Sequence, residues 1–215
     1  MLLQRCTNRI RVGGALLALL VLAGCGGTGS TQQAPESREQ VGAAGPLREI
    51  PPQAQTLYEQ ATAVMAAGDF VDAELRFKEF VLTYPDYPGA YVNLAIIHAN
   101  NENNTATREA LDAALALDPD YPAALNQLGM LLRKNGNFLE AEAAYLKAVT
   151  VSPDYALAHY NLGVLNELYL QRLEIALQHF ETYQELVPED KQVEKWIADL
   201  TRRIAASQRT ANVAE

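Results

Sequence analysis

The sequence has 215 residues, of which 49% are hydrophobic and 20% are charged, a mixture typical of a globular protein rather than of a disordered chain. An excess of Asp and Glu over Lys and Arg gives it a formal net charge of −9. Because nucleic acids and anionic membrane surfaces attract basic faces, this charge argues against both as binding partners and mildly favours basic protein partners.

The first 24 residues have the pattern of a secretory signal. Three arginines within residues 5–11 precede an apolar run over residues 15–22, and there is no acidic residue among them. The run is shorter than the roughly 20 apolar residues that span a bilayer. Both cysteines of the chain, Cys6 and Cys25, lie in the first 25 residues, so the rest of the chain can form no disulfide framework.

The string Leu22-Ala23-Gly24-Cys25 resembles the lipobox of bacterial lipoproteins at all four positions. The resemblance implies that residues 1–24 are removed and that Cys25 carries a diacylglycerol, whose acyl chains would anchor the protein to a membrane. Residue 26 is Gly rather than the Asp that favours inner-membrane retention in enteric bacteria, so the resemblance favours the periplasmic face of the outer membrane. An ordinary cleaved signal with an incidental cysteine is the alternative.

A segment rich in Gly, Ser, Gln and Pro follows, over residues 25–52. It has no apolar periodicity and cannot bury a core. We therefore expect a flexible tether that ends at two consecutive prolines, residues 51 and 52.

The rest of the chain repeats with a period of 34 residues. Pro-Asp-Tyr recurs at residues 85–87, 119–121 and 153–155, and Pro188 closes a fourth unit. This period is that of the tetratricopeptide repeat (TPR), and the third unit resembles the TPR pattern most closely. Its matching residues are Leu125, Leu128, Gly129, Leu132, Ala141, Tyr145, Ala148 and Pro153.

The TPR resemblance implies an all-α solenoid of four helix-turn-helix repeats. We expect TPR 1 at residues 53–87, TPR 2 at 88–121, TPR 3 at 122–155 and TPR 4 at 156–188. A capping helix is expected over residues 189–207, where apolar residues recur at helical spacing and Trp196 would cover the last repeat. Residues 208–215 are expected to be a disordered tail.

The turns inside the repeats differ. Residues 68–70 and 136–138 read Gly-Asp-Phe and Gly-Asn-Phe, in which glycine is free to take a positive φ. In TPR 2 four asparagines and Glu102, at residues 100–104, replace the glycine. Asparagine also tolerates the left-handed conformation, so we expect the turn to be kept. In TPR 4, residues 169–172 lack glycine and include one extra residue, which predicts a longer first helix or an irregular turn.

No catalytic or metal-binding motif is found in the repeats, so we expect neither enzymatic activity nor a cofactor. His98 and His159 occupy aromatic positions of the repeat, which predicts packing between helices. The Lys, Asn and Arg positions of a carboxylate clamp, as found in some TPR domains, are matched only by Asn93, so we do not expect such a clamp.

The TPR resemblance implies that a peptide or protein partner binds in a concave groove lined by the first helix of each repeat. The candidate residues are Tyr58, Thr62, Met65, Val92, Ile96, Asn100, Asn126, Met130, Arg133, Lys134, Tyr160, Val164 and Glu167. They are mainly apolar and aromatic, with Arg133 and Lys134 as a basic spot, and this suits a peptide docked by apolar anchors. The sequence therefore predicts a lipid-anchored adaptor; the alternatives are a self-associating TPR stack and an enzyme with an atypical site.

Overall fold

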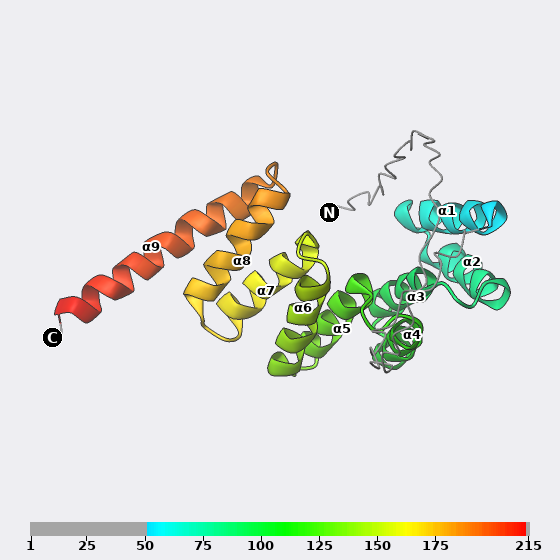
Figure 1. Ribbon diagram of the computed structural model, residues 1–215, viewed down its shortest axis with the longest axis horizontal. Coiled ribbons are helices and arrows are strands. Elements are labelled where there is room, and N and C mark those ends of the chain that lie inside the picture. Colours follow the sequence, from blue (N-terminus) through cyan, green and yellow to red (C-terminus); the bar gives the residue numbers. More distant parts are fainter. Residues whose placement is uncertain (1–50, 214–215) are drawn as a thin grey trace, which may run out of the picture. The chain divides into compact units, whose positions relative to one another are not determined.

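The computed structural model describes residues 51–213, with side chains through residue 210, and this part of the chain forms nine α-helices (Figure 1). They are α1 (Pro52–Ala66), α2 (Phe70–Thr83), α3 (Pro88–Asn100), α4 (Asn104–Leu117), α5 (Pro122–Lys134), α6 (Phe138–Val151), α7 (Ala156–Leu168), α8 (Leu173–Leu186) and α9 (Lys191–Val213). The expected all-α class with four helix pairs and a terminal helix is confirmed. Cys25, the predicted signal and nearly all of the predicted tether lie outside the described residues.

The helices α1 to α8 form four hairpins, and each helix packs against the next one along the chain. The first helices of neighbouring hairpins also contact each other; α3 contacts α5, and α5 contacts α7. The second helices make no comparable contacts with one another in the described part of the chain. The helices α1, α3, α5 and α7 therefore present a shared face, which we call the first-helix surface.

Each hairpin buries a small residue of its first helix and a large residue of its second helix. The small residues are Ala61, Ala95, Gly129 and Gly163, and the large ones are Phe77, Leu111, Tyr145 and Phe180. In TPR 3 a Cβ added to Gly129 would lie 2.4 Å from Cε1 of Tyr145, and in TPR 4 one added to Gly163 would lie 2.6 Å from the Phe180 ring. The two helices of each of these hairpins can pack this closely only because the first helix carries no side chain at the glycine.

The helix starts follow from local sequence. Proline stands in the first turn of α1, α3 and α5, where its missing N–H would have no partner within the helix. The carboxylate of Asp69 accepts a hydrogen bond from the backbone N–H of Asp72 (3.0 Å) and caps α2. Asn103 caps α4 in the same way, through the N–H of Ala106 (3.1 Å).

One residue in each hairpin turn takes a positive φ. Glycine does so in TPR 1 and TPR 3, with φ of 88° at Gly68 and 82° at Gly136. In TPR 2 the turn is kept as expected, but the residue that takes this conformation is Glu102 (φ 56°) rather than one of the asparagines. The hydrogen bonds of the turn determine which residue takes the positive φ. It is the residue before the one whose N–H donates back to the first helix, and in TPR 2 that residue is Glu102.

The TPR 4 turn is irregular rather than preceded by a longer helix. Helix α7 has 13 residues, the same as α3 and α5, which rules out the longer first helix. The extra residue instead lengthens the turn, in which Gln171 takes a φ of 55° and the N–H of Arg172 donates to the carbonyl of Asn166 (2.8 Å).

Replacing Glu102 by glycine is expected to raise the free energy of unfolding by about 1 kcal/mol, because a left-handed conformation costs an L-residue about that much more than it costs glycine. Urea denaturation of the two proteins measures the difference. Asn101→Gly is the matched control, since Asn101 has a φ of −83° and should only lose stability with glycine. An equal effect of both substitutions would contradict the strain at Glu102.

Helix α9 covers TPR 4 as expected but is longer than expected. Val193 and Leu200 are fully buried, and the Trp196 ring lies 5.9 Å from that of Tyr160 and 5.6 Å from that of Phe180. The helix continues to Val213, beyond the predicted end at residue 207 and into the predicted tail, which is a correction. Residues 205–213 contain no Gly or Pro, so nothing in the sequence stops the helix there.

Candidate functional site

The first-helix surface is tied together by side-chain hydrogen bonds between repeats. The amide of Asn93 donates to the hydroxyl of Tyr58 (2.9 Å), and the amide of Asn161 donates to the carbonyl oxygen of Asn126 (2.9 Å). Both bonds join residues 35 apart, so the same geometry recurs at the TPR 1–TPR 2 and TPR 3–TPR 4 contacts. At the TPR 2–TPR 3 contact this bond cannot form, because its first partner would be Val92.

Some of the candidate residues are buried beneath the first-helix surface rather than exposed on it. Val92 is 4% exposed and Asn126 is 1% exposed, and Met65 is likewise buried in the core. The hydroxyl of Thr62 donates to the carbonyl of Glu59 (2.9 Å) and is half-buried. Such residues can shape a binding surface, but they offer a partner little area to contact.

Gly89 is a close-packed position on this surface that the sequence analysis missed. A Cβ added there would lie 2.9 Å from the hydroxyl oxygen of Tyr58 and 3.0 Å from that of Tyr121. Two tyrosine hydroxyls from different repeats thus converge on bare backbone, next to the amide of Asn93. The sequence did contain a signal for this close approach: a glycine in the first turn of a helix, where glycine has no role in capping.

The open part of the surface lies in TPR 2 and TPR 3. Met130 is 38% exposed, Ile96 is half-buried, and Asn100 and Lys134 are exposed at the ends of their helices. Met130 lies one turn beyond Asn126 on the same face of α5. An exposed, flexible thioether next to polar amides suits contact with a variety of side chains.

Arg133 and Lys134 form a basic spot that the rest of the domain does not neutralise. The other basic residues between residues 51 and 190 all pair with acids at 2.6–2.9 Å; they are Arg76, Lys78, Arg108, Lys147 and Arg172. Arg133 and Lys134 form no ion pair with a described residue. One terminal nitrogen of Arg133 is buried and has no hydrogen-bond partner in the described structure. Two basic side chains in no ion pair favour a ligand that brings an acidic group.

The tyrosines near Arg133 remain uncharged. Burial raises the pKa of Tyr145 to about 12, and the nearby Arg133 guanidinium opposes this only in part. Burial also raises the pKa of Tyr160, and Asp190 adds to the effect. Both side chains therefore act as neutral polar groups at neutral pH.

The TPR 4 candidates belong to the contact with α9, which corrects their expected place on an open groove. Tyr160 packs on Trp196, and Glu167 accepts a hydrogen bond and ion pair from Arg203 at 2.6 Å. Val164 packs against the core cluster that includes Val193 and Leu200 of α9. The candidate site is therefore the first-helix surface of TPR 1 to TPR 3.

The histidines link helices. Nε2 of His159 lies 3.1 Å from the carbonyl of Pro153 and must donate to it, so in the neutral ring Nδ1 accepts from Nδ1 of His179, 3.2 Å away. Burial, with a further contribution from His159, lowers the pKa of His179 to about 4. His98 lies beside Glu74 of α2, at 3.9 Å. These positions account for the histidines as packing residues.

The described residues hold neither a metal-binding cluster nor a membrane-spanning helix. Between residues 51 and 210, no three His, Cys, Asp or Glu side chains come together to bind a metal ion. Within the nine helices, none has both the length and the apolar character that a bilayer span requires.

Three family models match the chain along the helix pairs just described. One described as TPR repeat matches residues 129–168, and two described as tetratricopeptide repeat match residues 58–122 and 110–143. The folded part of this chain is a TPR solenoid. The matches overlap end to end from TPR 1 into TPR 4. No curated protein matches the sequence.

Solved structures share this fold. Pseudomonas aeruginosa PilF has a TM-score of 0.64 and 21% identity, over 71% of this chain and 69% of its own. A thermophilic TPR protein of Thermus thermophilus has a TM-score of 0.61 and 22% identity, over 72% and 84%. The first TPR of Spaghetti (RPAP3), bound to the HSP90 peptide SRMEEVD, has a TM-score of 0.51 and 18% identity, over 55% and 95%. At these identities the similarity shows the fold alone.

Proposed function

We propose that this protein is a non-enzymatic scaffold that binds a peptide or protein partner on the first-helix surface of TPR 1 to TPR 3. The observation that carries the proposal is the contrast along this surface. In TPR 4 the α9 helix covers it, whereas in TPR 3 it presents an exposed methionine and two basic side chains in no ion pair with a described residue. The TPR domain of RPAP3, which has the same fold, binds a peptide of HSP90.

The surface also suggests the chemistry of the bound segment. An apolar anchor would contact Met130 and Ile96, and an acidic side chain would satisfy Arg133 and Lys134. The tyrosine hydroxyls that meet over Gly89 would accept hydrogen bonds from a segment that passes across them. The bound partner is therefore an extended or helical segment with apolar and acidic residues.

The proposed location is the bacterial cell envelope, with a lipid on Cys25 holding the domain at the periplasmic face of the outer membrane. The lipobox-like sequence at residues 22–25 and Gly26 support this location. A domain tethered near a membrane and able to bind a segment of another protein would serve the assembly of an envelope complex. Examples are a pilus or secretin, the outer-membrane assembly machinery, or a docked peptidoglycan enzyme.

Site-specific photo-crosslinking tests the proposed surface. A photoreactive amino acid in place of Met130 is expected to give a covalent adduct with one partner in intact cells, because this side chain is exposed on the binding surface. The same amino acid in place of Glu109, exposed on α4 and away from the first helices, is the control. Equal adducts from both positions, or none from Met130, would contradict the proposal. An adduct with a second copy of the chain would identify a self-associating stack instead.

A further inference from the structure

Helix α2 exposes three large apolar side chains on one line. Val71, Leu75 and Leu82 have 83%, 66% and 84% of their surface exposed. Their spacing of four and seven residues places them within about 40° of one another around the helix axis. We call Val71, Leu75 and Leu82 the α2 stripe. It lies on the second helix of TPR 1 and is independent of the first-helix surface.

The TPR fold itself does not require apolar residues at these positions. At the same register TPR 2 carries Thr105, Glu109 and Ala116, and TPR 4 carries Glu174, Gln178 and Glu185. Both of those hairpins are formed, with second helices of the same length as α2. Leaving three apolar side chains in water gives no benefit to the isolated domain, so the α2 stripe is best explained by contact with another molecule.

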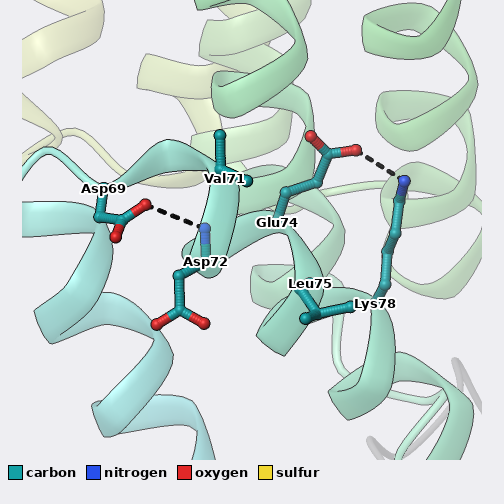
Figure 2. Close-up of a pocket in the computed structure, with 6 residues that line it drawn as sticks. All are labelled: Asp69, Val71, Asp72, Glu74, Leu75 and Lys78. Carbon is teal, nitrogen blue, oxygen red and sulfur yellow. Dashed lines mark hydrogen bonds and ion pairs between the residues drawn. The ribbon is translucent and has the colours of Figure 1, made fainter.

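Charged residues border the stripe on both sides. Figure 2 shows Val71 and Leu75 in a hollow that Asp69, Asp72, Glu74 and Lys78 also line. Asp72 pairs with Arg76 (2.8 Å) and Glu74 with Lys78 (2.6 Å), while Glu79 is exposed and in no ion pair with a described residue. A hydrogen bond from Lys78 lowers the pKa of Glu74, so this acid is ionised at neutral pH.

The negative charge around the stripe disfavours binding of a second copy of the chain or of an anionic membrane. Residues 51–190 contain 20 acidic and 7 basic side chains, so a second copy or an anionic membrane would bring like charge to this face. Two α2 helices packed antiparallel through the stripe would also place Asp72 of each copy near Glu79 of the other. A partner with basic flanks would instead gain from the same acids.

We propose that the α2 stripe docks an amphipathic helix of another protein, with apolar residues at helical spacing and Lys or Arg on their flanks. Apolar anchors would pack on Leu75 and Leu82, as ridges of one helix pack into the grooves of another. One basic flank would face Asp72 and Glu79, which lie on the same side of the stripe. The other would face the Glu74–Lys78 ion pair. The protein then has two separate binding surfaces, one on the first helices and one on α2.

A designed peptide provides the probe. It has three heptads with Leu at positions a and d and Lys at positions e and g, and a control peptide has Glu in place of each Lys. The receptor is the full chain carrying Cys25→Ser, which removes the predicted lipid. We expect the Lys peptide to bind at least tenfold more tightly than the Glu peptide in fluorescence anisotropy.

The test of the surface is the triple variant Val71→Thr, Leu75→Glu, Leu82→Ala, which gives α2 the residues that TPR 2 carries at this register. Because the positions are exposed, the variant should keep its helical circular dichroism while the Lys peptide binds at least tenfold more weakly. The matched control changes exposed leucines of α6 to their TPR 2 counterparts, as Leu139→Thr and Leu146→Asp, and should leave the affinity unchanged.

Three results would overturn the proposal. The first is equal affinity of the Lys peptide for the wild-type chain and the triple variant. The second is a dimer of the wild-type chain in light scattering that the triple variant does not form, which would make a second copy the occupant. The third is binding of the wild-type chain to vesicles of anionic lipid that the triple variant loses. Failure of Met130 to crosslink in cells would contradict the proposed scaffold function but would not bear on the proposal for the α2 stripe.

Discussion

The Gly129→Ala substitution is expected to lower the free energy of unfolding by about 2 kcal/mol. Its Cβ would lie 2.4 Å from the Tyr145 ring, which is fully buried and has no space into which to move. Overpacking of this kind costs up to about 3 kcal/mol, and the better helix propensity of alanine returns about 1 kcal/mol. Urea denaturation followed by circular dichroism measures the net effect.

A double-mutant cycle shows whether the ring is the cause. The pair Gly129→Ala and Tyr145→Leu reproduces Ala95 and Leu111, which TPR 2 buries at the same register. In the Tyr145→Leu background we expect Gly129→Ala to be neutral or stabilising, because the ring that it would strike is gone. A cost that is the same in both backgrounds would show that the close approach to Tyr145 is not what requires glycine.

The Cys25→Ser substitution is expected to move the protein from the membrane to the soluble fraction and to abolish its labelling by a fatty-acid analogue. A serine hydroxyl cannot form the thioether to diacylglycerol, and acyl chains contribute about 0.8 kcal/mol per buried CH₂ to membrane binding. Fractionation of cells grown with an alkyne-bearing palmitate measures both effects in one experiment.

Cys6→Ser is the matched control for this prediction. Cys6 lies within the segment predicted to be removed, so the substitution should change neither labelling nor fractionation. If the Cys25→Ser protein stayed on the membrane with its label, the lipoprotein proposal would be wrong. The TPR domain and its binding surfaces would be unaffected by that outcome.

The repeats could be predicted from sequence because their period is long and regular. The recurring Pro-Asp-Tyr at 34 residues fixed the register, and the third unit matched the TPR pattern closely enough to place both of its helices. Small residues such as Gly129 could be expected at the crossing of paired helices. These features depend on spacing along the chain, which a single sequence shows directly.

The turns and the chain end were harder to predict because backbone geometry decides them. Judged by residue type, asparagine is favoured for a left-handed conformation. The end of the preceding helix decides which residue of the turn must take that conformation, and in TPR 2 it is Glu102. Similarly, the spacing of apolar residues predicted an end to α9 near residue 207, whereas the absence of Gly and Pro lets the helix continue.

The binding candidates were predicted only in part. Register placed Met130 and Arg133 correctly on the first helices, but it could not show that Trp196 and Arg203 approach from α9 and cover the TPR 4 positions. The convergence of two tyrosine hydroxyls on Gly89 depends on the packing angle between repeats. Such contacts between units are not encoded in the pattern of any one repeat.

The division of the buried core has a consequence for how the stack opens. In a linear array each repeat is stabilised by its neighbours, so a boundary in the core decides where cooperativity breaks down. One cluster of buried residues runs from Ala54 of α1 to Leu131 of α5, whereas TPR 4 and α9 pack in a separate cluster around Phe180. TPR 4 with α9 is therefore a natural unit of partial unfolding, which can open while TPR 1 and TPR 2 stay packed on each other.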